Sequence, residues 1–372
     1  MKPAAFILVS PGPIDGYPPV QYQARLLADA GYPVTIITMP LHAGASTPNF
    51  SHPGVDVRCI SSASAFGATI ARVSHFARAL WDARRSLPHE TVEIAYDPMG
   101  IFYSDFTVNR PRWRIAHLHE LLQRHESAYI EKRLRTALHR YDLVVVPDVT
   151  RGVHTQKAID LKHAPMVVEN YPLRAIAPLT APAGTRSQRF EVVYCGVLGL
   201  NQKLDVVVRS ILSWPANADL VLIGNDRTPT AVGLRRLAEQ LGITWRVRFL
   251  GWMNTPDAEA RLAQSDLGVA FLDSRSEQLR TALTASNKRF QYMKAGLPQL
   301  GDTNPGVSGL LDGIGSCIRS DHDPEEIASL VTAYANDAER CAAEGKRAFV
   351  RHRQTYNYER AFQPVLDLVT TW

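Results

Sequence analysis

The chain has 372 residues, 45% of them hydrophobic and 21% charged, which is the composition of a globular protein and excludes a disordered one. One hydrophobic core rarely organises this length, so two domains are expected, and no apolar run approaches the roughly 18 residues of a membrane-spanning helix. The net charge of +5 favours anionic partners, but the arginines are too dispersed to indicate nucleic-acid binding.

The first half of the chain alternates strand-like apolar runs with helical patterns. Strands are predicted at 4–10, 33–38, 55–60, 92–96, 114–118, 143–147 and 166–169, and helices at 21–30 and 69–85. Such alternation is typical of parallel strands joined by right-handed crossovers. We therefore predict a Rossmann-like α/β domain over residues 1–172.

The loop after the first strand, residues 11–18, contains glycines without the spacing of a dinucleotide fingerprint. Asp15 and Gly16 in this loop are candidate ligand contacts of low specificity. Because the stretch after Met1 is too short for a secretion signal, we interpret it as the first strand.

The helical pattern near 66–85 interleaves apolar and basic residues. The apolar residues are Phe66, Ile70, Val73, Phe76, Leu80 and Trp81, and the basic ones are Arg72, Arg78, Arg84 and Arg85. One interpretation is a basic amphipathic helix that rests on an anionic membrane surface. The alternative is a core-facing helix with a solvated basic face.

Polar side chains follow two strands of the first half. Asp97 comes directly after strand 92–96, and His119 and Glu120 follow strand 114–118. Strand alternation places His117 and His119 on one face, with His119 nearer the carboxyl end. Histidine suits proton transfer, and Asp97 or Glu120 could act as a base. Each is also explained as a strand-end polar residue that satisfies a loop.

Residues 173–189 are rich in Pro, Ala, Ser and Thr, lack periodicity and are predicted to be an interdomain linker. A second alternation over 190–355 predicts another Rossmann-like domain, with elements at 190–194, 206–212, 219–223, 232–241, 246–250 and 267–272. Helical spacing of apolar residues in 356–372 predicts a C-terminal helix, which we expect to return to the N-terminal domain.

Glycines end three strands of the second half, at Gly196, at Gly224 before Asn225, and at Gly251 before Trp252. Ligands of open α/β sheets bind at this edge. Glycine allows close backbone approach to a ligand, and Lys203, seven residues after Gly196, supplies a cation or is a solvated surface lysine.

The segment 286–298 reads S-N-K-R-F-Q-Y-M-K-A-G-L-P, a lysine-led helix start with a Gly-Leu-Pro stop. Helix N-termini attract phosphate, and Lys288 adds charge. Asn287 caps the helix or bonds a phosphate oxygen, and Gln291 shares the face of Lys288. The segment predicts a nucleotide-diphosphate site.

Taken in order, segments 192–205, 220–226, 246–252, 265–271 and 287–298 resemble the glycosyltransferases of the GT-B fold, particularly the family 4-like group. The resemblance spans nearly the whole chain. It implies two Rossmann-like domains that face a cleft, and a nucleotide-diphosphate sugar as donor substrate, with no separate cofactor.

The resemblance also implies roles for single residues. It assigns Lys288 to the donor diphosphate, the Gly251–Trp252 loop to the nucleobase, and the loop with Asp15 and Gly16 to donor and acceptor contacts. His119 matches a strand-end histidine that borders the donor sugar. Trp252 covers the base or is a core or lip aromatic.

The chain departs from the family at two glutamates eight positions apart. Gln291 stands at the second position, where it can still bond ribose, and Leu283 stands at the first, where it cannot replace a carboxylate. Glu277 is a candidate substitute or an exposed loop residue. Donor sugar specificity, and retention or inversion of configuration, therefore stay open.

We expect transfer of a sugar to a saccharide or lipid-linked acceptor hydroxyl, in cell-surface polysaccharide or glycolipid synthesis. Because lysines and helix N-termini can stabilise the leaving group, metal-independent activity is predicted. The cysteines Cys59, Cys195, Cys317 and Cys341 show no zinc or disulfide spacing and favour a reducing cytoplasm. The alternatives are a nucleotide-sugar epimerase of the same fold and a catalytically silent nucleotide-sugar-binding subunit.

Overall fold

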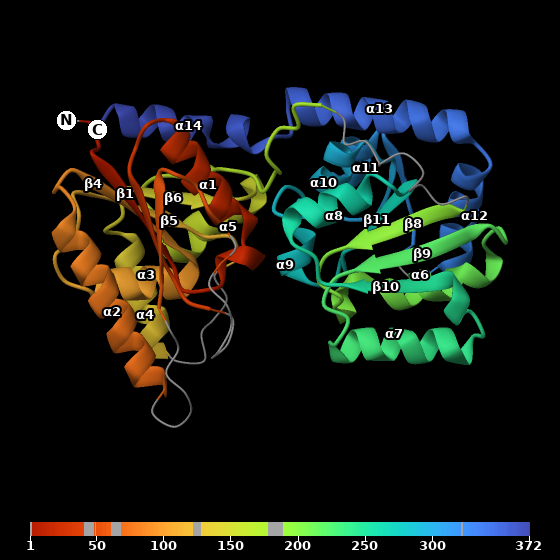
Figure 1. The fold of residues 1–372 in the computed structure, drawn as a ribbon, viewed down its shortest axis with the longest axis horizontal. Helices are drawn as coiled ribbons and strands as arrows, with labels where there is room; N and C mark the ends of the chain where they lie inside the picture. The colour runs from red at the N-terminus through yellow and green to blue at the C-terminus, as the bar shows by residue number, and fades with distance from the viewer. Residues whose placement is uncertain are drawn as a thin grey trace. The chain divides into compact units, whose positions relative to one another are not determined.

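The computed structural model describes residues 2–40, 48, 50–60, 68–121, 128–177, 189–320 and 323–372, with the backbone alone for 68–72 and 128–130. The chain forms two compact units. The first contains residues 1–170 together with 358–372, and the second contains 171–357. Each is built on one parallel sheet with helices on its faces (Figure 1). The predicted α/β fold with two Rossmann-like halves is confirmed.

The first unit has a seven-stranded sheet of order β3-β2-β1-β4-β5-β6-β7, in which all pairs are parallel. Its strands are β1 (Ala5–Ser10), β2 (Val34–Thr38), β3 (Val55–Cys59), β4 (Thr91–Tyr96), β5 (Trp113–His117), β6 (Leu143–Val146) and β7 (Met166–Val167). The central strands β1, β4 and β5 are buried along their whole length. Burial on both faces explains why apolar residues dominate these strands, and the polar residues in β4 and β5, among them Glu93 and Arg114, are buried as well.

The helices of the first unit connect consecutive strands. They are α1 (Pro18–Asp29), α2 (Ala68–Ser86), α3 (Asp97–Phe106), α4 (Ala128–Leu138), α5 (Val149–Ile159) and the C-terminal α14 (Tyr358–Thr370), with a 3₁₀ turn at Ile14–Gly16. Helix α14 lies against α1 (Figure 1). Gln23 Nε2 donates to Tyr358 Oη at 2.7 Å, and the rings of Trp113 and Trp372 stack 5.7 Å apart.

Helix α2 turns its apolar residues to the core. Phe76 and Leu80 are fully buried. Arg84, one turn further along the same stripe, is buried too and binds Glu93 through Nε and Nη2 at 2.8 Å each. The core-facing interpretation is therefore the correct one for these residues, and Arg84 does not belong to a solvated basic face. Phe66 and the side chains of Ile70 and Arg72 lie outside the described residues.

The second unit has a six-stranded parallel sheet of order β10-β9-β8-β11-β12-β13. Its strands are β8 (Phe190–Cys195), β9 (Ala218–Ile223), β10 (Val247–Gly251), β11 (Leu267–Ala270), β12 (Gln299–Gly301) and β13 (Gly315–Cys317). Its α-helices are α6 (Leu204–Ser210), α7 (Pro229–Gln240), α8 (Thr255–Leu262), α9 (Glu277–Arg280), α10 (Asn287–Ala295), α11 (Val307–Leu311), α12 (Pro324–Ala335) and α13 (Ala338–Gln354). Short 3₁₀ turns occupy Leu200–Gln202, Ile211–Ser213 and Thr244–Arg246.

Tyr171 and the described beginning of the expected linker belong to the second unit. The ring of Tyr171 meets Phe290 edge-on at 4.4 Å, and Ala175 N donates to His352 Nε2 at 3.1 Å. Residues 178–188 of the expected linker 173–189 lie outside the described residues. Within the described part of the chain, no helix has the length and apolar character needed to cross a membrane.

Candidate functional site

Three glycines form one edge of the sheet in the second unit. Gly196 follows β8, Gly224 follows β9 and Gly251 ends β10. Gly196 N donates to Ile223 O, and Gly224 N donates to Gly251 O, both at 2.9 Å. A Cβ atom on Gly224 would lie 2.1 Å from the Gly196 carbonyl oxygen, so only glycine fits there. The carboxyl edge of the sheet is therefore bare backbone that a ligand can approach closely.

Lys288 reaches from helix α10 to this glycine edge. Its Nζ donates to Gln202 Oε1 at 3.1 Å and lies 5.4 Å from the centre of the Tyr194 ring. A Cβ atom on Gly196 would be 3.3 Å from Lys288 Cε. Burial, reinforced by the charge of Arg289, lowers the pKa of Lys288 to about 8. The structure thus brings together the lysine and the first glycine that the sequence predicted.

Asn287 is the first residue of α10, and Ser286 occupies the N-cap position. The interpretation of Asn287 as a plain N-cap is therefore wrong. Its Oδ1 is buried without a hydrogen-bond partner. Gln291 lies three residues beyond Lys288 and is partly buried. Gly296 ends the helix in the left-handed conformation, with φ 69°, as the Gly-Leu-Pro stop predicted.

Lys203 is buried and paired. It adopts the left-handed conformation, with φ 53°, between the 3₁₀ turn and α6. Its Nζ lies 3.4 Å from Asp273 Oδ2. Hydrogen bonds from Arg275, followed by the charge of Lys203, hold the pKa of Asp273 well below its usual range. The alternative of a solvated surface lysine is therefore wrong, because a permanent carboxylate holds this ammonium group inside the unit.

Gln202 lies between the two lysines: its side chain contacts Lys288, and Lys203 is the next residue. Its Oε1 accepts hydrogen bonds from Lys288 Nζ and from Tyr194 Oη, the latter at 3.0 Å, and its backbone precedes Lys203. The sequence analysis missed Gln202. Its position directly before a lysine in a glycine-led loop is the only local signal it offers.

The neighbouring strand ends carry exposed side chains. Asn225 Oδ1 accepts from Arg227 N at 3.1 Å and shapes the turn after β9. Trp252, directly after β10, is 57% exposed, which excludes the interpretation as a core aromatic. A lip residue and a cover for a nucleobase both fit this exposure.

Leu283, which stands at the first departing position, and Glu277, the candidate substitute for the missing glutamate, have different surroundings. Leu283 packs on Gly306, where a Cβ atom would lie 2.6 Å from Leu283 Cδ2. Glu277 is exposed and opens the short helix α9. Leu283 therefore has an apolar packing role.

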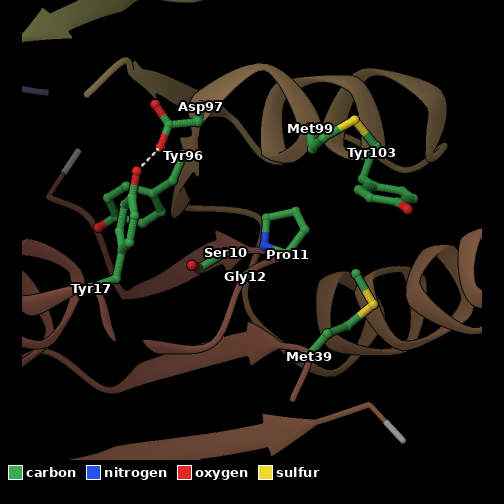
Figure 2. Close-up of a pocket in the computed structure, with 9 residues that line it drawn as sticks. All are labelled: Ser10, Pro11, Gly12, Tyr17, Met39, Tyr96, Asp97, Met99 and Tyr103. Atoms are coloured by element: carbon green, nitrogen blue, oxygen red, sulfur yellow. Dashed lines mark hydrogen bonds between the residues drawn. The ribbon is translucent and has the colours of Figure 1, made fainter. Parts of the chain in front are cut away.

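In the first unit, Asp97 joins three segments of the chain. Its Oδ2 accepts from Tyr17 Oη at 2.5 Å (Figure 2). The same Oδ2 lies 3.3 Å from His119 Nδ1, and Oδ1 accepts from His119 N at 2.7 Å. Burial alone would raise the pKa of Asp97, but the charge of His119 and the hydrogen bonds from His119 and Tyr17 lower it. Asp97 is thus a fixed carboxylate beside the His119 ring.

The rings around His119 hold it in place. It stacks on His117 at 4.2 Å and on Tyr96 at 5.7 Å, and Tyr17 meets it edge-on at 5.0 Å. His119 Nε2 is buried without a hydrogen-bond partner. Burial lowers the pKa of His117 well below its usual range, and Gln23 Nε2 contacts its Nδ1 at 2.8 Å, so His117 is a neutral packing residue. His119 is the one of the two with a carboxylate beside it.

The other candidates of the first unit contribute less to this cluster. Glu120 is exposed, with Oε2 3.7 Å from Arg151 Nη1, and Arg151 Nη1 donates to the carbonyl of His119. Asp15 is partly buried in the 3₁₀ turn and Gly16 is exposed. The next residue, Tyr17, makes the contact with Asp97, and the sequence analysis missed it.

A pocket of about 320 Å³ opens beside Asp97. Figure 2 shows the residues that line it, which come from the carboxyl ends of β1, β2 and β4 and from α3: Ser10, Pro11, Gly12, Tyr17, Met39, Tyr96, Asp97, Met99 and Tyr103. Only Asp97 among these was expected from the sequence. The part of the chain that the structure describes holds no cluster of His, Cys, Asp and Glu able to bind a metal ion.

Comparison with known proteins identifies the fold. Residues 189–337 match the family model described as glycosyl transferases group 1. No curated protein sequence matches the chain. Among solved structures, a sucrose-phosphate synthase from Thermosynechococcus elongatus superposes with a TM-score of 0.73 at 13% identity, covering 98% of each chain.

Two further structures agree. HepE from Anabaena in complex with UDP-glucose gives a TM-score of 0.74 at 14% identity, over 99% of this chain and 100% of that one. WaaG, a glycosyltransferase involved in lipopolysaccharide biosynthesis, gives 0.66 at 16% identity over the same shares. The predicted GT-B fold is confirmed.

Proposed function

We propose that this chain, a group 1 glycosyltransferase of the GT-B fold, moves a sugar from a nucleotide-diphosphate donor to an acceptor hydroxyl. The observation that carries the proposal is Lys288, whose ammonium group lies at the glycine edge of the second unit. Structures similar to this chain include HepE with UDP and with UDP-glucose, which supports a nucleotide-sugar donor.

The donor diphosphate is assigned to the edge formed by Gly196, Gly224 and the start of α10. Lys288 supplies a positive charge whose hydrogen-bond partner, Gln202, is neutral. As the bond between the anomeric carbon and the phosphate oxygen breaks, negative charge develops on the diphosphate, and fixed cations and helix N-termini stabilise it. We propose that this set acts without a metal ion.

The proton of the acceptor hydroxyl is assigned to His119. When Asp97 accepts a hydrogen bond from His119 Nδ1–H, the proton-accepting lone pair of the neutral ring is on Nε2. Among the described residues, Nε2 has no hydrogen-bond partner, and we assign its lone pair to the proton that leaves the acceptor oxygen as this oxygen bonds the anomeric carbon. Asp97 and Tyr17 are positioning residues in this scheme.

The proposal also covers the biosynthetic process and the cellular location of the reaction. We assign it to cell-surface polysaccharide or glycolipid synthesis, which is supported by the similarity to WaaG, a glycosyltransferase involved in lipopolysaccharide biosynthesis. A cytoplasmic location agrees with four cysteines that form no disulfide.

A thermal-shift panel followed by turnover tests the function. A matching nucleotide sugar stabilises the folded protein by mass action and raises its melting temperature. We expect UDP-, GDP- or ADP-sugars to give such a shift, Lys288→Met to remove it, and Lys346→Met on exposed helix α13 to leave it unchanged.

Nucleotide release that depends on an acceptor would then support transfer. Formation of an epimer without acceptor would instead indicate an epimerase. Binding without turnover on any acceptor would indicate a silent binding subunit.

A further inference from the structure

Methionine, tyrosine and proline side chains make up most of the lining of the pocket in the first unit. Met39 and Tyr103 are 3% and 4% exposed and form its buried part, and Met99 is 41% exposed and forms its rim. In Figure 2, Met99 and Tyr103 on α3 lie on one side and Met39 on the other, with Pro11 between them. Methionine side chains adapt to irregular apolar groups. The pocket thus offers a ligand an apolar surface.

Tyr17 and Asp97 occupy one end of the pocket and already share a 2.5 Å hydrogen bond. Ser10 and Tyr103 also belong to the lining and carry one hydroxyl each (Figure 2). A sugar ring has hydroxyls on most of its carbons, and each one buried without a partner costs free energy. The side of the pocket lined by methionines offers such hydroxyls few partners. The chemistry of the lining therefore favours a ligand that is mostly apolar and has few polar groups.

The volume limits the size of that ligand. About 320 Å³ is at the lower end of the range for small-molecule pockets, so it holds one ring system or a short alkyl group. The polar end points the hydroxyl of such a ligand toward Asp97, which contacts the ring of His119.

We infer that the acceptor is a small hydroxylated apolar compound, such as a phenol or a short-chain alcohol group, whose apolar part fills this pocket. The inference rests on the proposed sugar transfer, and it replaces the saccharide or lipid-linked acceptor expected from the sequence with a small apolar one. Met99 is then a specificity-determining residue, because it provides accessible apolar surface at the rim.

Binding of 4-methylumbelliferone, a fluorescent phenol, to the full chain tests the inference without any donor. We expect measurable affinity in the unchanged protein and at least roughly tenfold weaker binding in Met99→Gln, which places an amide in the apolar rim. Met99→Leu keeps the rim apolar and should retain the affinity. Phe106→Gln changes an exposed apolar residue at the end of the same helix, outside the pocket, and should leave binding unchanged.

Methyl glucoside serves as the saccharide probe and should not compete with the phenol. Competition by methyl glucoside, or equal phenol affinity in Met99→Gln and the unchanged protein, would overturn the inference. The thermal shift with nucleotide sugars is measured on every variant. A missing nucleotide shift in the unchanged protein would count against the proposed function, whereas phenol binding would still report on the pocket.

Discussion

Lys288 donates its ammonium hydrogen bond to Gln202, the residue directly before Lys203, at 3.1 Å. Gln202 therefore connects the two lysines, through its side chain to Lys288 and through the backbone to Lys203. The two ammonium groups differ in whether a carboxylate already neutralises them. Lys203 is offset by Asp273 at 3.4 Å, whereas Lys288 has an amide oxygen as its partner and, among the described residues, no ion pair. Lys288 is the stronger anion-binding group of the two.

Replacing Lys288 with Met should weaken nucleoside diphosphate binding about 10- to 100-fold, since a hydrogen bond to a charged group contributes about 1.5–3 kcal/mol. Lys203→Met should have a smaller effect, because Asp273 already offsets that charge. Isothermal titration with UDP, GDP and ADP measures both. Lys346→Met on the surface of the same unit is the control. An equal loss of affinity in this variant would show that the overall charge of the protein, and not Lys288 itself, determines binding.

The affinity for a nucleoside diphosphate should fall as the pH rises through about 8, the pKa of Lys288 in the protein without ligand. The pKa of Lys288 is lowered to about 8, so its ammonium group is charged below that pH and neutral above it. The affinity should therefore be highest below pH 8 and decline toward pH 9.5. Lys288→Arg should flatten the profile, because arginine stays charged. An identical decline in the arginine variant would rule out Lys288 as its cause.

Gly224→Ala should destabilise the second unit and impair nucleotide binding. The added methyl group would lie 2.1 Å from the Gly196 carbonyl oxygen, so the glycine edge must shift, at a cost of about 1–3 kcal/mol. Gly233→Ala in exposed helix α7 is the matched control. It meets no atom within 4 Å and should stabilise by up to about 1 kcal/mol. Urea denaturation compares the two, and equal stabilities would contradict this account.

Asp97→Asn should lower kcat by about 10²- to 10⁴-fold and leave nucleotide affinity unchanged. The amide cannot hold the His119 ring with a negative charge, so Nε2 becomes a weaker proton acceptor. Tyr17→Phe, which removes one hydrogen bond to Asp97, should have a smaller effect. Asp82→Asn on the exposed side of α2 is the control. Loss of nucleotide affinity in Asp97→Asn with kcat preserved would refute the assignment.

Activity should persist in excess EDTA. The sequence contains one Asp-x-Asp pattern, at 321–323, and Asp323 caps α12 by accepting from Glu325 N and Glu326 N. Turnover assays with EDTA alone and with EDTA plus excess Mg²⁺ make the comparison. Inactivation by EDTA that Mg²⁺ reverses would contradict metal independence.

The parts of the site that depend on local sequence were predictable. Helix α10 begins with Asn287 and ends at Gly296, and both ends follow from residue types within thirteen positions. Gly196, Gly224 and Gly251 were found because each comes at the end of a mostly apolar strand pattern. Alternation along β5 likewise singled out His119.

The partners of these residues were not predictable, because they are distant in sequence. Gln202 contacts Lys288 across 86 positions, and Tyr17 contacts Asp97 across 80. No periodicity within one element shows which side chains of another element it will meet. The pairing of Lys203 with Asp273 was missed for the same reason.

Arg84 illustrates a pattern that was available and misinterpreted. It continues the four-residue spacing of Phe76 and Leu80, which places it on the buried stripe of α2. Glu93 in the apolar strand β4 is its counterpart, and the two bury their charges together. A charged residue on an apolar stripe predicts a buried partner, and the acidic residue in the adjacent strand was the candidate.

The chain leaves the first unit after Asn170 and rejoins it at Tyr358. In terms of connectivity, the second unit is an insertion within the first. A fragment of residues 171–357 preserves one continuous unit, whereas a fragment of residues 1–170 lacks α14 and leaves Gln23 and Trp113 without their contacts to Tyr358 and Trp372. Removal of residues 358–372 should therefore unfold the first unit, although most of that unit lies far from the cut in sequence. The second unit, which ends at the cut, should stay folded.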